Sequence, residues 1–137
     1  MPGIAIGGVS VGEPINQMHK IVRETCPLLP EDRPRYLMGI GTIREMAVAV
    51  ANGIDMFDCV LPTRVARNGA LFTKKGRVNV NTSIFRGVDC PIDKDCRCYT
   101  CLRFSTGYLH HLFKAREYLA YRLASIHNIT FIYNLTR

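Results

Sequence analysis

The stretch Ile54-Asp55-Met56-Phe57-Asp58-Cys59-Val60 is a short, largely apolar run that directly follows the helix-stop pair Asn52-Gly53. A run of this length and composition is typical of a β-strand. Working outward toward the N-terminus, the same signals predict a strand within Gly3–Gly12, a helix over Pro14–Thr25, a strand over Tyr36–Ile40, and a helix that ends near Ala51. Thr42, with Glu45 three residues on, predicts a capping box at the start of that last helix. This order predicts an α/β fold with parallel strands, because parallel neighbours need a crossover between them.

Asp58 lies at the carboxyl end of the third predicted strand. Side chains alternate along a strand, so Ile54, Met56 and Asp58 share one face and the carboxylate ends an apolar face. In parallel α/β folds the active site forms at the carboxyl ends of the strands, where an aspartate acts as a nucleophile, general base or metal ligand. The alternative is a carboxylate that caps a nearby turn or pairs with an arginine.

A cationic segment follows, Leu61-Pro62-Thr63-Arg64-Val65-Ala66-Arg67-Asn68-Gly69, and we predict that it forms a loop. Its two arginines are three residues apart and close in sequence to the candidate carboxylate. Arginine donates paired hydrogen bonds to phosphates and also contacts base edges, so the segment favours RNA or DNA as a ligand. A solvated basic loop that binds nothing is the alternative.

The C-terminal half predicts a β-hairpin and a long helix. Leu71–Thr73 and Arg77–Val80 flank Lys74-Lys75-Gly76, whose glycine suits a hairpin turn. From Tyr108 to about Ile126 the apolar residues recur at helical spacing, which predicts one continuous helix.

Three of the six cysteines, Cys96, Cys98 and Cys101, lie within six positions. Thiols this close together are poorly placed to cross-link a fold as disulfides, and the short spacers let their sulfurs converge on one tetrahedral zinc ion. A zinc ion with four protein ligands is structural, because catalytic zinc keeps a position open for water. Spacing alone leaves the fourth ligand open among four residues: Cys90, His110, His111 and His127.

Composition and charge describe a globular protein with an excess of positive charge. The 137 residues include 18 Lys+Arg and 11 Asp+Glu, a formal net charge of +7, and 47% of them are hydrophobic. These values exclude a disordered or low-complexity chain and predict a polyanionic partner, with nucleic acid first. No apolar run approaches the roughly 18 residues of a membrane helix, and Met1-Pro2-Gly3 lacks a basic signal start, so we expect a soluble, cytoplasmic protein.

Together these segments resemble the tRNA-guanine transglycosylases, also called queuine tRNA-ribosyltransferases. The resemblance covers nearly the whole chain and rests on Gly7-Gly8-Val9-Ser10-Val11-Gly12-Glu13, Tyr36-Leu37-Met38-Gly39, Asp55-Met56-Phe57-Asp58-Cys59-Val60-Leu61-Pro62-Thr63-Arg64 with Arg67-Asn68-Gly69, and the cysteine cluster followed after 25 residues by His127. It implies exchange of guanine at wobble position 34 of tRNA for a 7-deazaguanine, preQ1 or queuine. The implied binding partner is the tRNA anticodon stem-loop.

The resemblance also implies roles for individual residues. Asp58 matches the nucleophile that forms a covalent ester with the ribose, and Gly8 and Met38 match residues that bind the base. Two segments match RNA-binding segments: Gly39-Ile40-Gly41-Thr42-Ile43-Arg44-Glu45 and Thr63-Arg64-Val65-Ala66-Arg67. Cys96, Cys98, Cys101 and His127 match the ligands of one structural Zn²⁺. Val11 resembles the bacterial-type members, which accept preQ1.

Members of this family are (β/α)8 barrels, and a barrel needs about 250 residues. The resemblance therefore implies the C-terminal part of a barrel, with its last three strands at about residues 1–69 and a hairpin and zinc-binding subdomain at about residues 70–137. The second aspartate of the family, its general acid/base, would lie outside this chain. Full-length members are expected to form homodimers. A noncatalytic RNA-binding subunit and a purely structural zinc module are the alternatives.

Overall fold

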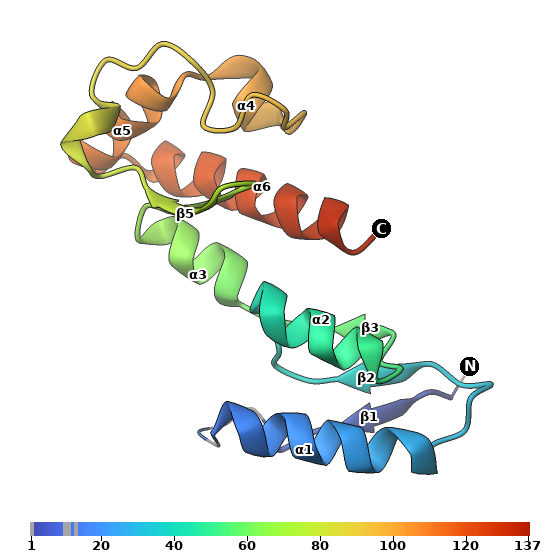
Figure 1. Ribbon diagram of the computed structural model, residues 1–137. Helices are drawn as coiled ribbons and strands as arrows, with labels where there is room; N and C mark the ends of the chain where they lie inside the picture. The colour runs from blue at the N-terminus through green and yellow to red at the C-terminus, as the bar shows by residue number, and fades with distance from the viewer. Residues whose placement is uncertain (1, 10–11, 13) are drawn as a thin grey trace. The chain divides into compact units, whose positions relative to one another are not determined.

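The computed structural model describes residues 2–9, 12 and 14–137, so Ser10, Val11 and Glu13 of the glycine-rich motif lie outside the described residues. The chain divides into two compact units, Met1–Leu61 and Pro62–Arg137 (Figure 1).

The first unit is built on three parallel strands in the order β1-β2-β3. Its elements are β1 (Ile4–Ile6), α1 (Ile15–Thr25), the 3-10 helix η1 (Cys26–Leu28), β2 (Arg35–Leu37), α2 (Ile43–Ala51) and β3 (Met56–Phe57). The predicted order of strands and helices and the parallel pairing are confirmed.

The third strand is shorter than predicted, two residues instead of the run from Ile54 to Val60. Ile54 belongs to the exit from α2, because its N–H donates to the carbonyl oxygen of Ala49 at 3.1 Å. At the other end the chain turns, and the N–H of Leu61 donates to Sγ of Cys59 at 3.3 Å. The shared apolar face predicted for Ile54, Met56 and Asp58 is therefore wrong for Ile54, which is buried while the other two are exposed.

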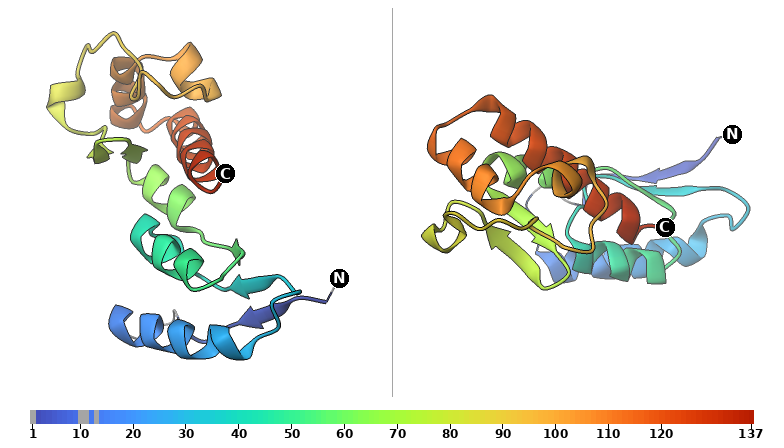
Figure 2. Two further views of the ribbon diagram at one scale, coloured as in Figure 1. Left: turned by 45° about the vertical axis from the view of Figure 1, so that its right-hand side comes forward. Right: turned by 90° about the horizontal axis from the view of Figure 1, so that it is seen from above.

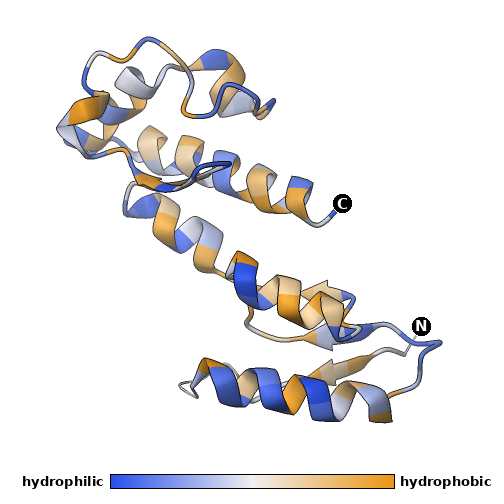
Figure 3. Ribbon diagram, in the orientation of Figure 1, coloured by the Kyte–Doolittle hydropathy of each residue, from blue (hydrophilic) through white to orange (hydrophobic). Residues whose placement is uncertain are grey.

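The two faces of the sheet differ in burial. Ile6 and Leu37, which pair in register, are buried on the face that α1 and α2 cover (Figure 2). Hydrophobic and hydrophilic residues alternate around α1, and it buries Met18 and Val22 (Figure 3). The opposite face carries Met56, which is 52% exposed. Helices on one face only leave an apolar sheet surface open in this unit.

The turn between β2 and α2 is fixed by a helix cap and a close approach. The Thr42 hydroxyl accepts a hydrogen bond from the N–H of Glu45 at 3.3 Å, which is one of the two bonds of the predicted capping box. A Cβ on Gly41 would collide with the side chain of Cys59. Glycine is thus required at position 41 for the turn to pack against the end of β3.

The second unit combines a hairpin with helices. Its elements are α3 (Leu61–Arg67, whose first residue ends the first unit), β4 (Ala70–Thr73), β5 (Gly76–Asn79), the 3-10 helix η2 (Ser83–Phe85), α4 (Tyr99–Arg103), α5 (Thr106–Lys114) and α6 (Tyr118–Leu135). The hairpin is antiparallel, as predicted, and pairs Thr73 with Gly76. Gly76 has φ of +114°, a conformation that favours glycine.

Two predictions of secondary structure in this unit are wrong. The cationic segment is the helix α3 and not a loop; Pro62 in the first turn is compatible with a helix, since the first N–H groups have no partner within the helix. The single long helix is two helices, α5 and α6, because Arg116 adopts φ of +57° and ends the first one. Periodicity continues across this break without a glycine or proline, so the sequence pattern does not reveal it.

The core of the second unit lies between the hairpin, α5 and α6, which pack together. Its buried members are Ala66, Leu71, Val80, Leu109, Leu112, Phe113, Ala120, Leu123 and Ala124. Within the described residues, no helix combines the length and the apolar character needed to cross a membrane.

Candidate functional site

The carboxyl ends of the three parallel strands meet at one edge of the sheet. Ile6 pairs with Leu37, and Leu37 pairs with Phe57, so the next residue of each strand, Gly7, Met38 and Asp58, leaves the sheet at the same level. The N–H of Met38 still donates to the carbonyl oxygen of Ile6 at 3.1 Å. The three segments singled out in the sequence therefore converge on one edge.

Asp58 is exposed at this edge and held by two donors. Its Oδ1 accepts hydrogen bonds from the Tyr36 hydroxyl at 2.6 Å and from the Gly39 N–H at 2.9 Å. These bonds, that of Tyr36 foremost, lower the pKa of Asp58, whereas the pKa of Tyr36 is raised, chiefly by the same bond. The carboxylate is thus ionised and oriented. The bond from Gly39 also caps the turn after β2. The turn-capping role, which was the alternative for this aspartate, is therefore present in the structure.

The glycine pair after β1 lies beside Met38. A Cβ on Gly7 would stand 3.2 Å from Sδ of Met38, whereas the position of a Cβ on Gly8 is open. Gly8 has φ of +74°, and Met38 is 44% exposed. The backbone at Gly8 is therefore open, and the exposed side chain of Met38 lies beside Gly7.

In each of the two candidate RNA-binding segments, only some of the side chains are exposed to solvent. In the segment Gly39–Glu45, Ile40 and Gly41 are buried, while Thr42, Ile43 and Arg44 are exposed around the N-terminus of α2. In the segment Thr63–Arg67, Ala66 is buried in the core, and Thr63 and Val65 are half-buried. Arg64 and Arg67 are exposed one helical turn apart on α3, so both guanidinium groups are available to one ligand.

The four ligand atoms of Cys96, Cys98, Cys101 and His127 lie within 4.8 Å of one another. The His127 Nδ1 is 3.8, 3.5 and 3.3 Å from the sulfurs of these cysteines in the same order. Cys98 is the N-cap of α4, and α6 carries His127. All six cysteines are free thiols, so nothing diverts these sulfurs into disulfides.

Hydrogen bonds inside the cluster prepare it for a cation. A bond from Cys101 is the main cause that lowers the pKa of Cys98 to about 3, and the same bond is the main cause that raises the pKa of Cys101. Burial lowers the pKa of His127, but the Cys98 thiolate and the carbonyl of Phe72 outweigh it and raise the pKa. Three sulfurs and one imidazole nitrogen form a donor set that fits Zn²⁺.

The comparison with known proteins decides the family. The family model described as "Queuine tRNA-ribosyltransferase" matches residues 1–137. The chain belongs to the queuine tRNA-ribosyltransferase family. It is 58% identical over 136 residues to the queuine tRNA-ribosyltransferase of Synechococcus sp. (strain CC9311), covering 99% of this chain and 37% of that relative.

Two further relatives give the same result. The queuine tRNA-ribosyltransferase of Cyanothece sp. (strain PCC 7425 / ATCC 29141) is 58% identical over 137 residues, which are 100% of this chain and 36% of the relative. That of Dehalococcoides mccartyi (strain ATCC BAA-2100 / JCM 16839 / KCTC 5957 / BAV1) is 55% identical over 134 residues, 98% of this chain and 34% of the relative. The chain thus spans about a third of the length of these members of the queuine tRNA-ribosyltransferase family.

Two residues that the sequence pattern does not reveal, Phe72 and Asn128, hold the His127 region of the cysteine–histidine cluster in place. The carbonyl oxygen of Phe72 lies 2.7 Å from Nε2 of His127 and fixes the ring so that Nδ1 faces the sulfurs. Asn128 is fully buried, accepts from the Phe72 N–H, and donates to the carbonyls of Pro62 and Ala70, all at 3.0 Å. The only sequence signal for these roles is the adjacency of Asn128 to a ligand histidine.

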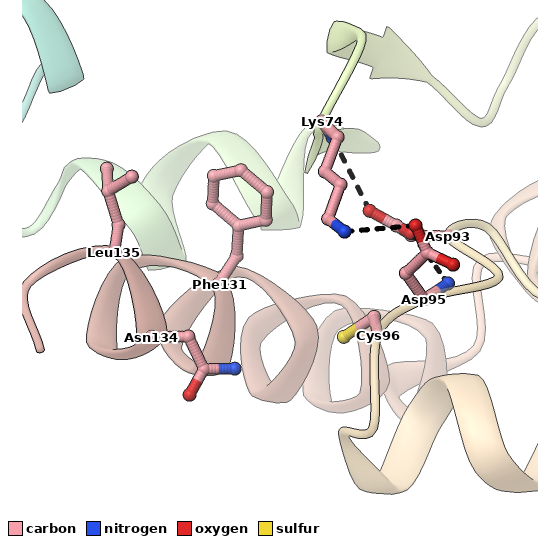
Figure 4. A pocket seen from close by; sticks show the side chains of 7 residues that line it. All are labelled: Lys74, Asp93, Asp95, Cys96, Phe131, Asn134 and Leu135. Atoms are coloured by element: carbon pink, nitrogen blue, oxygen red, sulfur yellow. Dashed lines mark hydrogen bonds and ion pairs between the residues drawn. The ribbon is translucent and has the colours of Figure 1, made fainter.

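A pocket of about 200 Å³ adjoins the cluster in this family member (Figure 4). Its walls include the ion pair between Nζ of Lys74 and Oδ2 of Asp95 at 2.9 Å, and the ring of Phe131. Cys96, the half-buried member of the cluster, lines it as well.

The positive charge is concentrated in the second unit of this queuine tRNA-ribosyltransferase family member. Residues 62–137 carry 13 Lys+Arg against 4 Asp+Glu, a formal net charge of +9, whereas residues 1–61 carry 5 against 7, a net charge of −2. The unit that holds α3 and the cysteine cluster therefore has a positive electrostatic potential.

Proposed function

We propose that this chain carries the C-terminal part of a tRNA-guanine transglycosylase that exchanges guanine at wobble position 34 for a 7-deazaguanine. The observation that carries the proposal is the convergence of Gly7, Met38 and an ionised Asp58 at the carboxyl edge of a parallel sheet. Active sites of α/β folds form at this edge. The family to which the chain belongs supplies the reaction class.

In the proposed reaction the Asp58 carboxylate attacks C1′ of the ribose and expels guanine with its bonding electrons. The enzyme then holds the RNA as a glycosyl ester until the incoming base attacks the same carbon and restores the carboxylate. Tyr36 and Gly39 orient Oδ1 of Asp58 and keep it ionised before attack. Gly8 and Met38 would bind the heterocycle, since the open backbone of one and the exposed thioether of the other admit a flat ring.

RNA binding is assigned to the exposed residues of the two candidate RNA-binding segments, Gly39–Glu45 and Thr63–Arg67. Arg64 and Arg67 on α3 contact the wobble region and its phosphates, while Thr42 and Arg44 at the start of α2 contact the backbone. The charge of +9 on residues 62–137 supports this assignment, because phosphate contacts dominate the affinity for RNA.

The cofactor we propose is one structural Zn²⁺ held by Cys96, Cys98, Cys101 and His127. Bound there, the ion would cross-link the segment before α4 to α6 and stabilise the second unit. With four protein ligands the site has no position for a reacting water, so Asp58 and not the metal carries the chemistry.

The first unit supports the proposal of an incomplete barrel. It has three parallel strands, helices on one face, and the exposed apolar side chains of Met38 and Met56 on the other. In a (β/α)8 barrel this second face is turned to the interior, and the other strands pair with the free edges of β1 and β3. The missing strands would also carry the general acid/base. Cytoplasmic location, homodimer formation in the full-length protein and preQ1 or queuine as the incoming base belong to the same proposal.

The test is detection of a covalent complex between the zinc-loaded chain and a tRNA anticodon stem-loop on a denaturing gel and by mass spectrometry. The part of the Synechococcus relative that precedes the matching region is supplied as a separate polypeptide in half of the reactions. We expect an adduct that depends on Asp58 and is lost in Asp58→Asn.

The matched control is Asp55→Asn. Asp55 accepts a hydrogen bond from the Arg35 N–H at 2.8 Å, which an asparagine oxygen retains, so this variant keeps the adduct. An adduct that persists in Asp58→Asn would refute the nucleophile. RNA binding without an adduct under any condition would favour the noncatalytic RNA-binding subunit, for which the charge of residues 62–137 is the supporting observation.

A further inference from the structure

A basic hollow lies on the second unit, formed by residues that have no role in the proposed function. It has a volume of about 450 Å³ and is formed between η2 and α5. Its lining includes Ser83, Arg86, Gly107, His110, His111 and Lys114. The described lining contains two cationic side chains, two imidazoles and a hydroxyl, but no carboxylate, so its chemistry selects an anion.

The position of the charged groups follows from helix geometry. Gly107, His110, His111 and Lys114 are spaced by three and four residues, so they form one face of α5. Arg86, the residue after η2, supplies the opposite wall. The two cations therefore come from different elements and converge on one space.

The wall opposite α5 is held firmly in place. The Gly107 N–H donates to the carbonyl oxygen of Val88 at 2.8 Å, and the Thr106 N–H and hydroxyl both donate to the carbonyl oxygen of Cys90 at 2.7 Å. A Cβ on Gly107 would stand only 2.9 Å from the Val88 nitrogen. The missing side chain at position 107 thus allows the backbone after η2 to pack directly on α5, which fixes the distance across the hollow.

His110 gives the hollow a buried polar group. Its side chain is only 7% exposed, and its Nδ1 lies 2.7 Å from the carbonyl oxygen of Val80. A carbonyl only accepts, so Nδ1 carries the proton and the ring orientation is fixed. Nε2 is on the opposite edge of the ring, and His110 is one of the residues that line the hollow.

We propose that this hollow binds a phosphate group of the RNA backbone, a second contact site beyond the α3 arginines. Arg86 and Lys114 neutralise the phosphate, and the Ser83 hydroxyl and the His111 ring are hydrogen-bond donors to its oxygens. That the phosphate belongs to RNA rests on the proposed function. The net charge of +9 on this unit favours a polyanion over a single small anion.

The test measures binding of a fluorescein-labelled anticodon stem-loop to the zinc-loaded full chain by anisotropy over a range of KCl concentrations. In Arg86→Gln/Lys114→Gln we expect about ten-fold weaker binding at low salt and a log–log salt slope smaller by about one. The matched control is Lys75→Gln/Arg122→Gln, which removes the same charges from exposed positions of the same unit and is expected to change the affinity less than two-fold. Both double variants should melt within about 2 °C of the parent chain, because all four side chains are exposed.

Each outcome has a defined meaning. Equal affinities and slopes in the two double variants overturn the hollow as an RNA site, and if Arg64→Gln/Arg67→Gln then weakens binding alone, the proposed function stands. A parent chain that binds no stem-loop overturns both proposals.

Inorganic phosphate distinguishes the source of the anion. It is titrated at constant ionic strength while the amide signals of Gly87 and Gly107 are followed by NMR. Micromolar binding of phosphate that leaves the affinity for the stem-loop unchanged identifies a free-phosphate site and overturns the RNA assignment. Weak phosphate binding at these amides that the stem-loop displaces supports it.

Discussion

Asn128→Ala is expected to destabilise the second unit by about 3 kcal/mol. The fully buried side chain of Asn128 forms three hydrogen bonds with backbone groups of Pro62, Ala70 and Phe72. Alanine removes the side-chain partner of the Phe72 N–H and of the carbonyls of Pro62 and Ala70, and each loss costs about 1 kcal/mol. These bonds tie α6 to α3, which carries the arginines, and to the strand that orients His127, so the effect reaches both functional regions.

Urea unfolding of the zinc-loaded chain, followed by tyrosine fluorescence, measures this change. Five of the six tyrosines lie in residues 62–137 and the chain has no tryptophan, so the signal reports chiefly on the second unit. With a urea dependence of about 1 kcal/mol per M for a unit of this size, the midpoint should fall by about 3 M. Asn134→Ala, at an exposed position of the same helix, should shift the midpoint by less than about 0.5 M. A fall below 1 M for Asn128→Ala, or one equal to that of the control, would refute the hydrogen-bond argument.

Three further predictions concern the cysteine–histidine cluster, Asp58 and the turn after β2. Cys98→Ser should abolish stoichiometric zinc binding and lower the melting temperature by more than about 10 °C, since three ligands do not close the site. Cys90→Ser, the control, should retain zinc by elemental analysis, and equal zinc contents in the two variants would contradict the ligand set. Tyr36→Phe should raise the pKa of Asp58, because the hydrogen bond that contributes most to the lowered pKa is lost. In a carbon-detected NMR titration the Asp58 carboxylate should protonate at a higher pH than in the parent chain, and an unchanged pKa would count against this prediction. Since the pKa of Asp58 is lowered in the folded chain, its contribution to stability is present above the unfolded pKa and is lost as the pH falls through the folded pKa. Gly41→Ala should cost about 1–3 kcal/mol in urea unfolding through its collision with the residue after Asp58, and no loss would show that the turn can move aside.

Predictions that rest on local interactions agree with the structure. The capping residue Thr42 and the hairpin around Lys74-Lys75-Gly76 each depend on groups a few residues apart, and both are found as predicted. At two places the sequence pattern was insufficient: Leu61–Arg67 forms a helix and not a loop, and the helix is interrupted at Arg116 although the apolar periodicity continues. The burial of Ala66 in the core fixes the first of these choices.

The sequence by itself determined the order of strands and helices, the clustering of three thiols and, through its motifs, the family. Residue spacing alone left the fourth ligand open among Cys90, His110, His111 and His127, and the family motif favoured His127. Only the tertiary structure brings the imidazole of His127 to the sulfurs, because α6 packs beside α4 and the carbonyl of Phe72 turns the ring. It likewise supplies Tyr36 and Gly39 as partners of Asp58 across the parallel sheet. Contacts between residues 19 to 55 positions apart depend on how the elements pack, and no local propensity encodes them.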